Sequence, residues 1–338
     1  MILIVDVGTT SVRVATMNSD GDIVDFHQQQ QPPSTPFPGL VEFDPQLLAH
    51  TVVELATSVM TRATPISGVA ITTQRASTVV WDRISGEPIG PGLSWQDLRT
   101  VGECMIAKSE HGVAVAPNQS ATKAQWLLNS VEHARDRDLC VGTVDSWIVW
   151  SLSQGQSHVT DHTNAAVTGW YLPQTADWDD RLCEVFDTPR SMLPLIVDSV
   201  GECAVAHALP GAPPIVAVIG DQQASLVGQG CVSPGLAKIT FGTGGMLDTV
   251  ISEQSPLAQT TRRGEGGCFG IVAWAEHGKR VFGAESIMLA AGSNIDWLRD
   301  DLNLISSSAE SHDLASMCQS TEGVLFVPAP LGLGTPHW

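Results

Sequence analysis

The segment from Ile215 to Gly230 places one carboxylate, Asp221, between an apolar run and a stretch that can form a helix. Residues 215–219 have the composition of a buried strand, and a helix can follow from Gln222. A carboxylate at the carboxyl end of a strand lies where ligand crevices form in open α/β sheets. Alternatively, Asp221 caps its own helix by accepting a backbone N–H, and the local sequence alone favours this cap.

Two loops of similar composition follow predicted strands that are far apart in the chain. Residues 8–11 read Gly-Thr-Thr-Ser and residues 242–245 read Gly-Thr-Gly-Gly, and each loop leads into another predicted strand. Backbone N–H groups and hydroxyls in such loops suit phosphate oxygens. Either loop alone is a weak signal, because most turns of this kind bind only water. Two such hairpins that face each other from two domains would grip a polyphosphate from both sides.

Asp6 and Arg13 flank the first of these loops. A carboxylate beside a phosphate is repulsive unless a cation lies between them, so Asp6 suggests Mg²⁺ held partly through water. The residues are equally compatible with a strand-end Asp whose oxygens accept local N–H groups. Arg13 could reach a phosphate, although a solvated position is commoner for a single arginine.

The elements that must position these side chains alternate between strands and helices. The predicted strands are a meander over residues 2–30, strands at 68–72 and 270–273, and a buried strand after residue 323. The predicted helices are one from Pro45 to about Arg62, capped by Asp44, and others over 120–131, 142–152, 178–186 and about 285–301. The pattern predicts an α/β fold with two domains, residues 1–228 and 229–338. We expect the second to be incomplete, because residue 338 falls in a loop with no closing helix.

Arg75 and Trp95 follow predicted strands in the first domain. They could supply a polar contact and an apolar wall for a small polyhydroxy ligand, although Trp95 in isolation is slightly more typical of plain core. The neighbouring pair Asp161 and His162 has neither a nucleophile motif nor metal-ligand spacing beside it. We therefore expect the pair to have a hydrogen-bonded structural role.

Composition narrows the class of partner. The chain has 338 residues, of which 43% are hydrophobic and 16% charged, which excludes a disordered chain. A net charge of −19 and the lack of a basic stripe argue against nucleic-acid or anionic-membrane partners. The seven cysteines contain no C-x-x-C pair, and no apolar run reaches the roughly 18 residues of a membrane span. These features predict a cytoplasmic protein with reduced thiols.

Ten motifs in chain order resemble the FGGY carbohydrate kinases, most closely the glycerol kinases. They are DVGTTSVR, ITTQRASTVVWD, SWQDLRT, SATKAQWLL, GTVDSWIVW, HVTDHTNA, IGDQQASLVGQ, AKITFGTGG, WLRDDL and VPAPLGLGTPHW. The resemblance covers the whole chain and implies an actin-like, ribonuclease H-like fold of two domains with ATP and Mg²⁺ in the cleft between them. The implied reaction transfers the γ-phosphoryl group of ATP to a primary hydroxyl of a small polyol, with glycerol as the leading substrate.

The resemblance also implies roles for individual residues. Asp221 corresponds to the general base and, with Asp6, to the metal-associated carboxylates. The implied polyol site comprises Arg75, Ala76, Trp95, Asn118, Asp221, Gln222 and Met246. The implied nucleotide contacts are Thr9, Thr10, Ser11, Arg13, Gly242, Thr243, Gly244, Gly292 and Asp296.

Four positions depart from the glycerol kinase pattern. Ala76 stands where those kinases have a Glu that hydrogen-bonds the polyol, Asn118 where they have a Tyr, and Met246 where they have a Phe. Asp296 replaces a Gln near the nucleotide. The departures leave open a kinase for another small polyol or sugar, and also a non-catalytic actin-like fragment. Homo-oligomer formation is left open as well.

Overall fold

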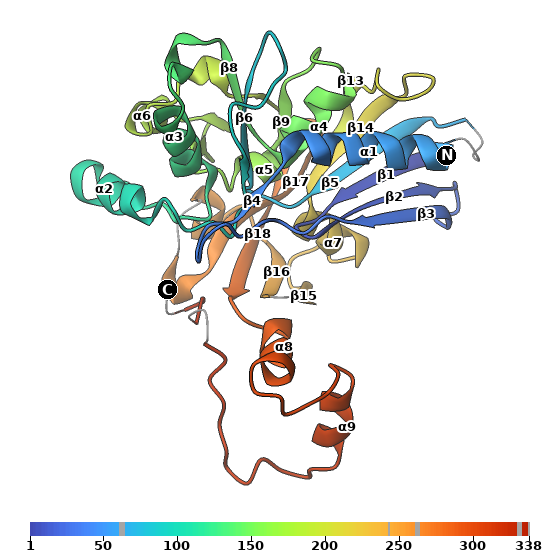
Figure 1. The fold of residues 1–338 in the computed structure, drawn as a ribbon, viewed down its shortest axis with the longest axis vertical. Coiled ribbons are helices and arrows are strands. Elements are labelled where there is room, and N and C mark those ends of the chain that lie inside the picture. The colour runs from blue at the N-terminus through green and yellow to red at the C-terminus, as the bar shows by residue number, and fades with distance from the viewer. Residues whose placement is uncertain (61–64, 243, 261–263, 330–332, 337–338) are drawn as a thin grey trace.

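A computed structural model describes residues 1–60, 65–242, 244–260, 264–329 and 333–336. Its first six sheet strands are β1 (Ile2–Val7), β2 (Ser11–Met17), β3 (Ile23–Gln30), β5 (Gly68–Thr73), β13 (Val200–Val205) and β14 (Pro214–Gly220). The next four are β15 (Ala237–Phe241), β16 (Gly245–Ile251), β17 (Phe269–Glu276) and β18 (Lys279–Met288). Within the described residues they form one mixed sheet in the order β15-β16-β18-β17-β13-β14-β5-β1-β2-β3 (Figure 1).

Three parallel strands determine where side chains converge. β1 pairs in parallel with β5, and β5 with β14, so that Val7, Thr73 and Gly220 lie side by side at one edge. The loop at residues 8–11, the dipeptide after β5 and Asp221 therefore leave the sheet together. The antiparallel meander β1-β2-β3 is confirmed, and the alternating residues of β1 that face the core are fully buried.

Two helices cover one face of this half of the sheet. They are α1 (Pro45–Met60) and α4 (Val144–Leu152), which pack against each other and against the strands (Figure 1). The predicted cap is confirmed, because Asp44 Oδ1 accepts the N–H groups of Gln46 and Leu47 from 2.9 and 3.0 Å. Of the helices in the described ranges, none combines the length and apolar character that crossing a bilayer requires.

The two halves of the sheet meet along β13 and β17. Their register joins only Val200 and Glu276, and Ser199 strengthens the seam by accepting the N–H of Ala275 on its hydroxyl at 3.0 Å. Helix α7 (Asp221–Gly228) lies at the junction and contacts β5 and β14 on one side and β16 and β17 on the other. The carboxylate at the start of α7 is thus placed between the halves.

A smaller subdomain projects from the first half. Its strands are β4 (Glu42–Phe43), β6 (Thr78–Asp82), β7 (Gly92–Leu93), β8 (Leu139–Thr143), β9 (Val159–Asp161), β10 (Tyr171–Leu172), β11 (Asp177–Trp178) and β12 (Leu195–Val197). Its helices are α2 (Val101–His111), α3 (Ser120–Ser130) and α6 (Asp180–Val185), whereas α5 (His162–Ala165) packs against β14 and β17 of the main sheet. Strands β4-β7-β6-β8 form a sheet whose neighbouring loops carry Trp95 and Asn118. The helices predicted over 120–131, 142–152 and 178–186 are confirmed with slightly different ends.

Two predictions for the second half are wrong. The helix predicted from about residue 285 begins later than expected. Strand β18, which pairs with β16 and β17, continues to Met288, and α8 spans only Gly292–Asp300. Strand pairing here overrides the helical propensity of an Ala-Glu-Ser sequence. The described residues from 323 onward form no strand, and Leu325 is 90% exposed. With α9 (Glu310–Ser316), this segment forms an arm below the sheet (Figure 1).

Asp145 is a fully buried carboxylate in the first turn of α4. The hydroxyls of Thr143 and Thr160 donate hydrogen bonds to it, the second at 2.7 Å. Burial, together with the nearby charge of Asp161, raises the pKa of Asp145 to about 7. Because the ordinary value is 3.8, protonated Asp145 stabilises the fold at low pH, and this contribution is lost as pH rises toward about 7.

Replacing Asp145 by Asn removes this titration. We expect the free energy of unfolding of Asp145→Asn to increase relative to that of the wild type between about pH 4 and about pH 7, because only the wild type must take up a proton or bury a charge at this position when it folds. Urea unfolding at several pH values measures the difference. Asp136→Asn changes an exposed carboxylate and is the matched control. A stability difference between Asp145→Asn and the wild type that stays constant with pH would contradict this account.

Candidate active site

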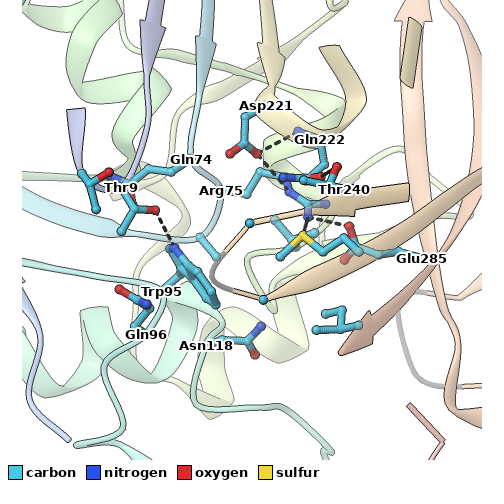
Figure 2. Close-up of a pocket in the computed structure, with 17 residues that line it drawn as sticks. Thr9, Gln74, Arg75, Trp95, Gln96, Asn118, Asp221, Gln222, Thr240 and Glu285 are labelled. Atoms are coloured by element: carbon cyan, nitrogen blue, oxygen red, sulfur yellow. Dashed lines mark hydrogen bonds and ion pairs between the residues drawn. The ribbon is translucent and has the colours of Figure 1, made fainter. Parts of the chain in front are cut away.

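A cavity of about 280 Å³ lies at the edge where β1, β5 and β14 end, and the second half of the sheet closes its other side (Figure 2). It is lined by Thr9, Thr10, Gln74, Arg75, Ala76, Trp95, Gln96, Asn118, Val167, Asp221, Gln222, Thr240, Gly242, Gly244, Met246, Glu285 and Ile287. The structure thus gathers the predicted polyol residues and parts of both Gly-Thr loops into one cavity. Figure 2 shows these side chains converging from elements that are distant in sequence.

Asp221 is the first residue of α7, and Gly220 is its N-cap. The local sequence favoured Asp221 as the N-cap, and this prediction is wrong, because Asp221 lies one residue inside the helix. Its Oδ1 accepts the N–H of Gln222 from 2.8 Å, and its side chain is 32% exposed toward the cavity. Burial raises the pKa of Asp221 to about 6; Arg75 opposes this rise, while the charges of Asp6 and Glu285 add to it. Asp221 is therefore mainly ionised at neutral pH but able to take up a proton.

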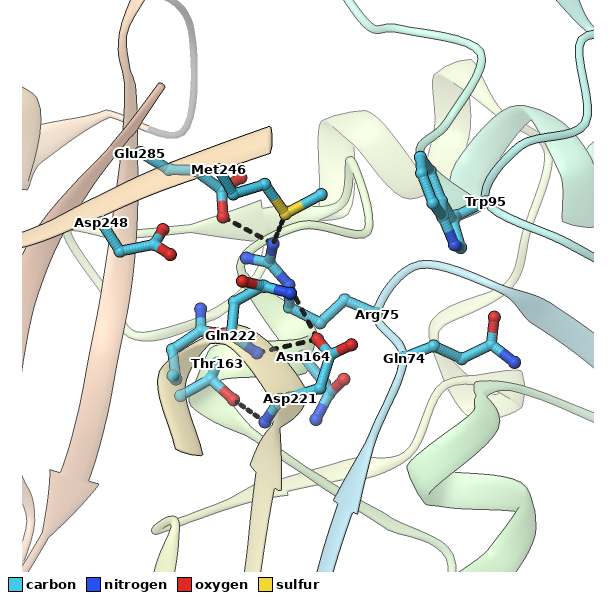
Figure 3. Close-up of polar contacts among 12 residues, drawn as sticks. Gln74, Arg75, Trp95, Thr163, Asn164, Asp221, Gln222, Met246, Asp248 and Glu285 are labelled. Carbon is cyan, nitrogen blue, oxygen red and sulfur yellow. Dashed lines mark hydrogen bonds and ion pairs between the residues drawn. The ribbon is translucent and has the colours of Figure 1, made fainter. Parts of the chain in front are cut away.

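The expected structural role of Asp161 is confirmed. Its carboxylate caps α5 by accepting the N–H groups of Thr163 and Asn164 from 3.1 and 3.0 Å. The hydroxyl of Thr163 in turn accepts the N–H of Gly220 from 2.8 Å, which fixes the residue before Asp221 (Figure 3). Asp161 thus supports the position of Asp221 without lining the cavity.

Arg75 extends from the end of β5 toward the second half of the sheet (Figure 3). Its Nη2 lies 2.5 Å from Glu285 Oε2 and 3.9 Å from the sulfur of Met246, and its Nε lies 3.8 Å from Asp221 Oδ1. The Arg75 side chain is only 9% exposed. Its Nη1 is buried and has no hydrogen-bond partner in the described part of the chain. One buried donor of Arg75 is thus unsatisfied in this structure.

Gln222 is held from the second half of the sheet. Lys238 Nζ donates to Gln222 Oε1 from 2.5 Å and to Thr240 Oγ1 from 2.7 Å. Lys238 also forms an ion pair at 2.7 Å with Asp248, and both side chains are essentially inaccessible to solvent. Because the carbonyl oxygen of Gln222 is already occupied, its amide N–H groups are the part of the side chain available to a ligand.

The opposite wall of the cavity is carried by the subdomain. Trp95 Nε1 donates to Thr9 Oγ1 from 3.0 Å, which links this wall to the first Gly-Thr loop. Ala76 is buried and has a φ of 63°, a left-handed conformation that is uncommon for a residue with a side chain. The backbone carbonyl of Asn118 accepts a hydrogen bond of 3.0 Å from the fully buried Lys123. Burial lowers the pKa of Lys123 to about 7.

The two Gly-Thr loops have compact backbones. Gly8 N donates to the carbonyl of Ser11 from 3.0 Å, and Gly242 N to that of Gly244 from 2.9 Å. A Cβ on Gly244 would lie 2.9 Å from the carbonyl oxygen of Met288, so the close approach of these strands requires glycine. Thr243, which was predicted to contact the nucleotide, lies outside the described residues.

Five predicted site residues do not line the cavity. They are Asp6, Ser11, Arg13, Gly292 and Asp296. Asp6 and Arg13 are cross-strand neighbours that form an ion pair at 2.9 Å, which occupies both side chains. Ser11 is buried at the start of β2, and Gly292 N donates to the carbonyl of Gly242 from 2.7 Å. Asp296 forms an ion pair with Arg299 at 3.1 Å. Their roles at the nucleotide remain predictions.

Sequence reasoning did not identify Lys238, Asp248 and Glu285. They lie on the adjacent strands β15, β16 and β18, where Asp248 is the register partner of both Lys238 and Glu285. A signal was available, because each is a charged residue in an otherwise apolar or alternating strand. Buried charges in proteins are normally paired, so three such strands together could have been recognised as a polar cluster.

Comparison with known proteins identifies related sequences over the whole chain. The model for the FGGY family of carbohydrate kinases, N-terminal domain, matches residues 1–228. A glycerol kinase of Oceanobacillus iheyensis is 39% identical over 357 aligned positions, covering 100% of this chain and 70% of that protein. A glycerol kinase of Alkalilimnicola ehrlichii is also 39% identical, with 71% of its length covered. The chain thus spans about 70% of the length of these relatives.

Solved structures resemble the fold over nearly the whole chain. A Plasmodium falciparum glycerol kinase with ADP superimposes with a TM-score of 0.86 at 26% identity, covering 97% of this chain and 69% of that one. A xylulose kinase of Lactobacillus acidophilus gives a TM-score of 0.84 at 19% identity, covering 99% and 70% of the two chains. The predicted two-domain α/β architecture of the sugar kinases is therefore confirmed.

Proposed function

This chain belongs to the FGGY family of carbohydrate kinases, and we propose that it transfers the γ-phosphoryl group of ATP to a primary hydroxyl of glycerol, giving glycerol 3-phosphate. The observation that carries the proposal is the single cavity in which Asp221, the polyol wall and both Gly-Thr loops meet. Glycerol phosphorylation is the activity named for relatives 39% identical to this chain.

Asp221 is the general base of the proposed reaction. Its ionised carboxylate accepts the proton of the hydroxyl that attacks phosphorus, while Gln222 and the Thr163 hydroxyl keep Asp221 in place. A pKa of about 6 means that the carboxylate is free of a proton at neutral pH yet basic enough to take one. Most of the rate enhancement then comes from positioning and charge neutralisation, as in other phosphoryl transfers.

The two loops are suited to a polyphosphate. Thr9 and Thr10 present hydroxyls on one side of the cavity, and the backbone at Gly242 and Gly244 faces it from the other. ATP bound between them would supply the phosphoryl group. We assign the halves of the molecule accordingly, residues 1–228 to polyol binding and the first phosphate loop, and residues 229–338 to the second loop.

A magnesium ion fits this donor set when phosphate is present. Among the described residues, no three His, Cys, Asp or Glu side chains are grouped so that they could hold a metal ion unaided. Mg²⁺ commonly takes only one or two carboxylates in addition to phosphate oxygens and water. Asp221 and Asp6 would be those carboxylates, and the ion would neutralise charge on the phosphates. Asp6 would then exchange some of its contact with Arg13 for water or metal.

The polyol would lie between Trp95 and Arg75. The indole forms an apolar wall, and the amide of Gln222 can donate a hydrogen bond to a hydroxyl oxygen, with the guanidinium group of Arg75 in the same wall. Ala76 and Asn118 provide less polar contact than the Glu and Tyr of the glycerol kinase pattern.

The seven free cysteines and the use of ATP are typical of a cytoplasmic enzyme, and we propose a cytoplasmic location for this protein.

Removing the proposed base tests the assignment directly. We expect Asp221→Asn to lower kcat by about 10² to 10⁴, the usual contribution of general base catalysis, because the amide cannot accept the hydroxyl proton. Glycerol affinity, measured by calorimetry, should change by less than about tenfold, since Asn keeps the size and one acceptor oxygen. Asp187→Asn, at an exposed surface carboxylate, is the matched control. Near-normal turnover in Asp221→Asn would remove the base assignment.

The pH dependence of kcat reports the same group. Because Asp221 must be ionised to act as a base and its pKa is raised to about 6, we expect kcat to rise through about pH 6 and then to level off. Initial rates at saturating glycerol and ATP measure this limb. If kcat instead rises near pH 3.8, the ordinary pKa of an aspartate, burial does not raise the pKa of Asp221 in the working enzyme.

Ala76 tests the choice of polyol. If glycerol is the natural substrate, Ala76→Glu adds a hydrogen-bond acceptor beside it and should lower KM for glycerol by about tenfold, the effect of roughly one good hydrogen bond. Ala76→Gln, which is similar in size but uncharged, is the control for bulk. The alternative is a longer polyol that the wild type phosphorylates faster than glycerol. If Ala76→Glu abolishes turnover of that polyol, the longer polyol is the substrate, because the added side chain would occupy the space of its extra carbons.

A further inference from the structure

We propose that Lys123 is a positioning residue of the polyol site, because the hydrogen bond from its Nζ to the backbone carbonyl of Asn118 holds the Asn118 side chain where it faces a bound polyol. The inference rests on the proposed function and adds to it a residue that does not itself line the cavity. The family resemblance assigned no role to Lys123.

Lys123 is completely buried in the first turn of α3. Within the described residues its side chain forms no ion pair, and its one hydrogen bond runs from Nζ to the carbonyl oxygen of Asn118 at 3.0 Å. Placing an amine in the interior without a carboxylate partner costs free energy, and a methionine of similar length would avoid that cost. The stability of the fold alone therefore does not account for a lysine at this position.

Asn118 depends on this contact. Among the described residues, the hydrogen bond from Lys123 is the one in which Asn118 takes part. The half-buried side chain of Asn118 lines the cavity on the side that also carries Trp95 (Figure 2). Its amide can both donate and accept a hydrogen bond, as a polyol hydroxyl requires. Lys123 thus fixes the backbone that presents this amide to the cavity.

The first turn of α3 also supports two other parts of the cavity wall. The hydroxyl of Ser120 donates to the carbonyl of Ala76 from 3.1 Å. The N–H of Ala121 donates to the carbonyl of Thr168, the neighbour of Val167, from 2.9 Å. Ala76 and Val167 both line the cavity. The turn that contains Lys123 therefore joins three wall segments that are distant in sequence.

The groups that carry out the reaction lie on other elements. Asp221 begins α7, and the two Gly-Thr loops follow β1 and β15. A displaced Asn118 weakens the binding of the polyol in the ground state and in the transition state alike. Such a loss raises KM for the polyol and leaves kcat and KM for ATP nearly unchanged.

Lys123→Met tests the proposal. At about pH 8 most of Lys123 is already neutral, because burial lowers its pKa to about 7, and the neutral amine still donates to Asn118. The variant therefore loses a hydrogen bond rather than a charge. We expect KM for glycerol to rise about tenfold, the effect of roughly one hydrogen bond, while kcat and KM for ATP change less than about threefold. Initial rates and calorimetry with glycerol measure these values.

A double-mutant cycle shows whether Lys123 acts through Asn118. We expect Asn118→Ala to raise KM for glycerol about tenfold by removing the contact itself. In that background Lys123→Met should raise KM by less than about twofold more, because the side chain that Lys123 positions is already absent. If Lys123 acted only by stabilising α3, the two effects would multiply.

Two control variants separate positioning from loss of stability. Leu128→Ala removes a buried side chain of the same helix and should lower the melting temperature without changing KM for glycerol. Lys108→Met makes the same substitution at an exposed position of α2 and should change neither. If Lys123→Met does not fold, Lys123→Gln, which is shorter and uncharged, takes its place in the cycle.

Three results overturn the proposal. They are an unchanged KM for glycerol in the folded Lys123 variants, effects of Lys123→Met and Asn118→Ala that multiply, and a KM for ATP that rises as much as KM for glycerol. A wild type without kinase activity on any polyol would instead refute the proposed function. If the wild type phosphorylates another polyol faster than glycerol, the same cycle is measured with that polyol.

Discussion

The parallel pairing of β1, β5 and β14 is the constraint on which the site depends. Since parallel strands end at the same edge, the chain after Val7, the chain after Thr73 and the chain after Gly220 must emerge together. This brings a phosphate-type loop, Arg75 and Asp221 into one cavity although they are more than 200 positions apart in sequence at the extremes. The buried faces of these strands and the cover of α1 and α4 hold that edge rigid.

The charges at the seam between the two halves are buried as ion pairs. Unpaired buried charges are costly, and the cluster avoids this cost by alternating cations and carboxylates across three strands and the end of β5. Within it, Arg75 Nε lies 3.8 Å from Asp221 Oδ1 and opposes the rise that burial causes in the pKa of Asp221, while Arg75 Nη2 contacts Glu285. Glu285 of the second half of the sheet thereby fixes the side chain of Arg75, which belongs to the first half.

Local sequence patterns predicted the first half well, because its helices and strands agree with their own propensities and caps, as at Asp44 and over β1 to β3. They failed where tertiary pairing decides the structure. Residues 285–288 became strand between two partners, whereas the described residues after 323 form no strand, and of their apolar side chains Phe326 stacks on Trp297 of α8. The family resemblance named most of the residues that line the cavity, but it did not point to Glu285, which meets Arg75 through a contact between distant strands.

The most direct test of the central claim, one cavity that holds polyol and nucleotide together beside Asp221, is a crystal structure with glycerol and a non-hydrolysable ATP analogue. The account predicts a primary hydroxyl of glycerol within hydrogen-bond distance of Asp221. It also predicts the phosphate chain between the Thr9 and Thr10 hydroxyls and the backbone at Gly242 and Gly244. A nucleotide bound away from these loops, or a polyol bound where Asp221 cannot reach its hydroxyl, would contradict it.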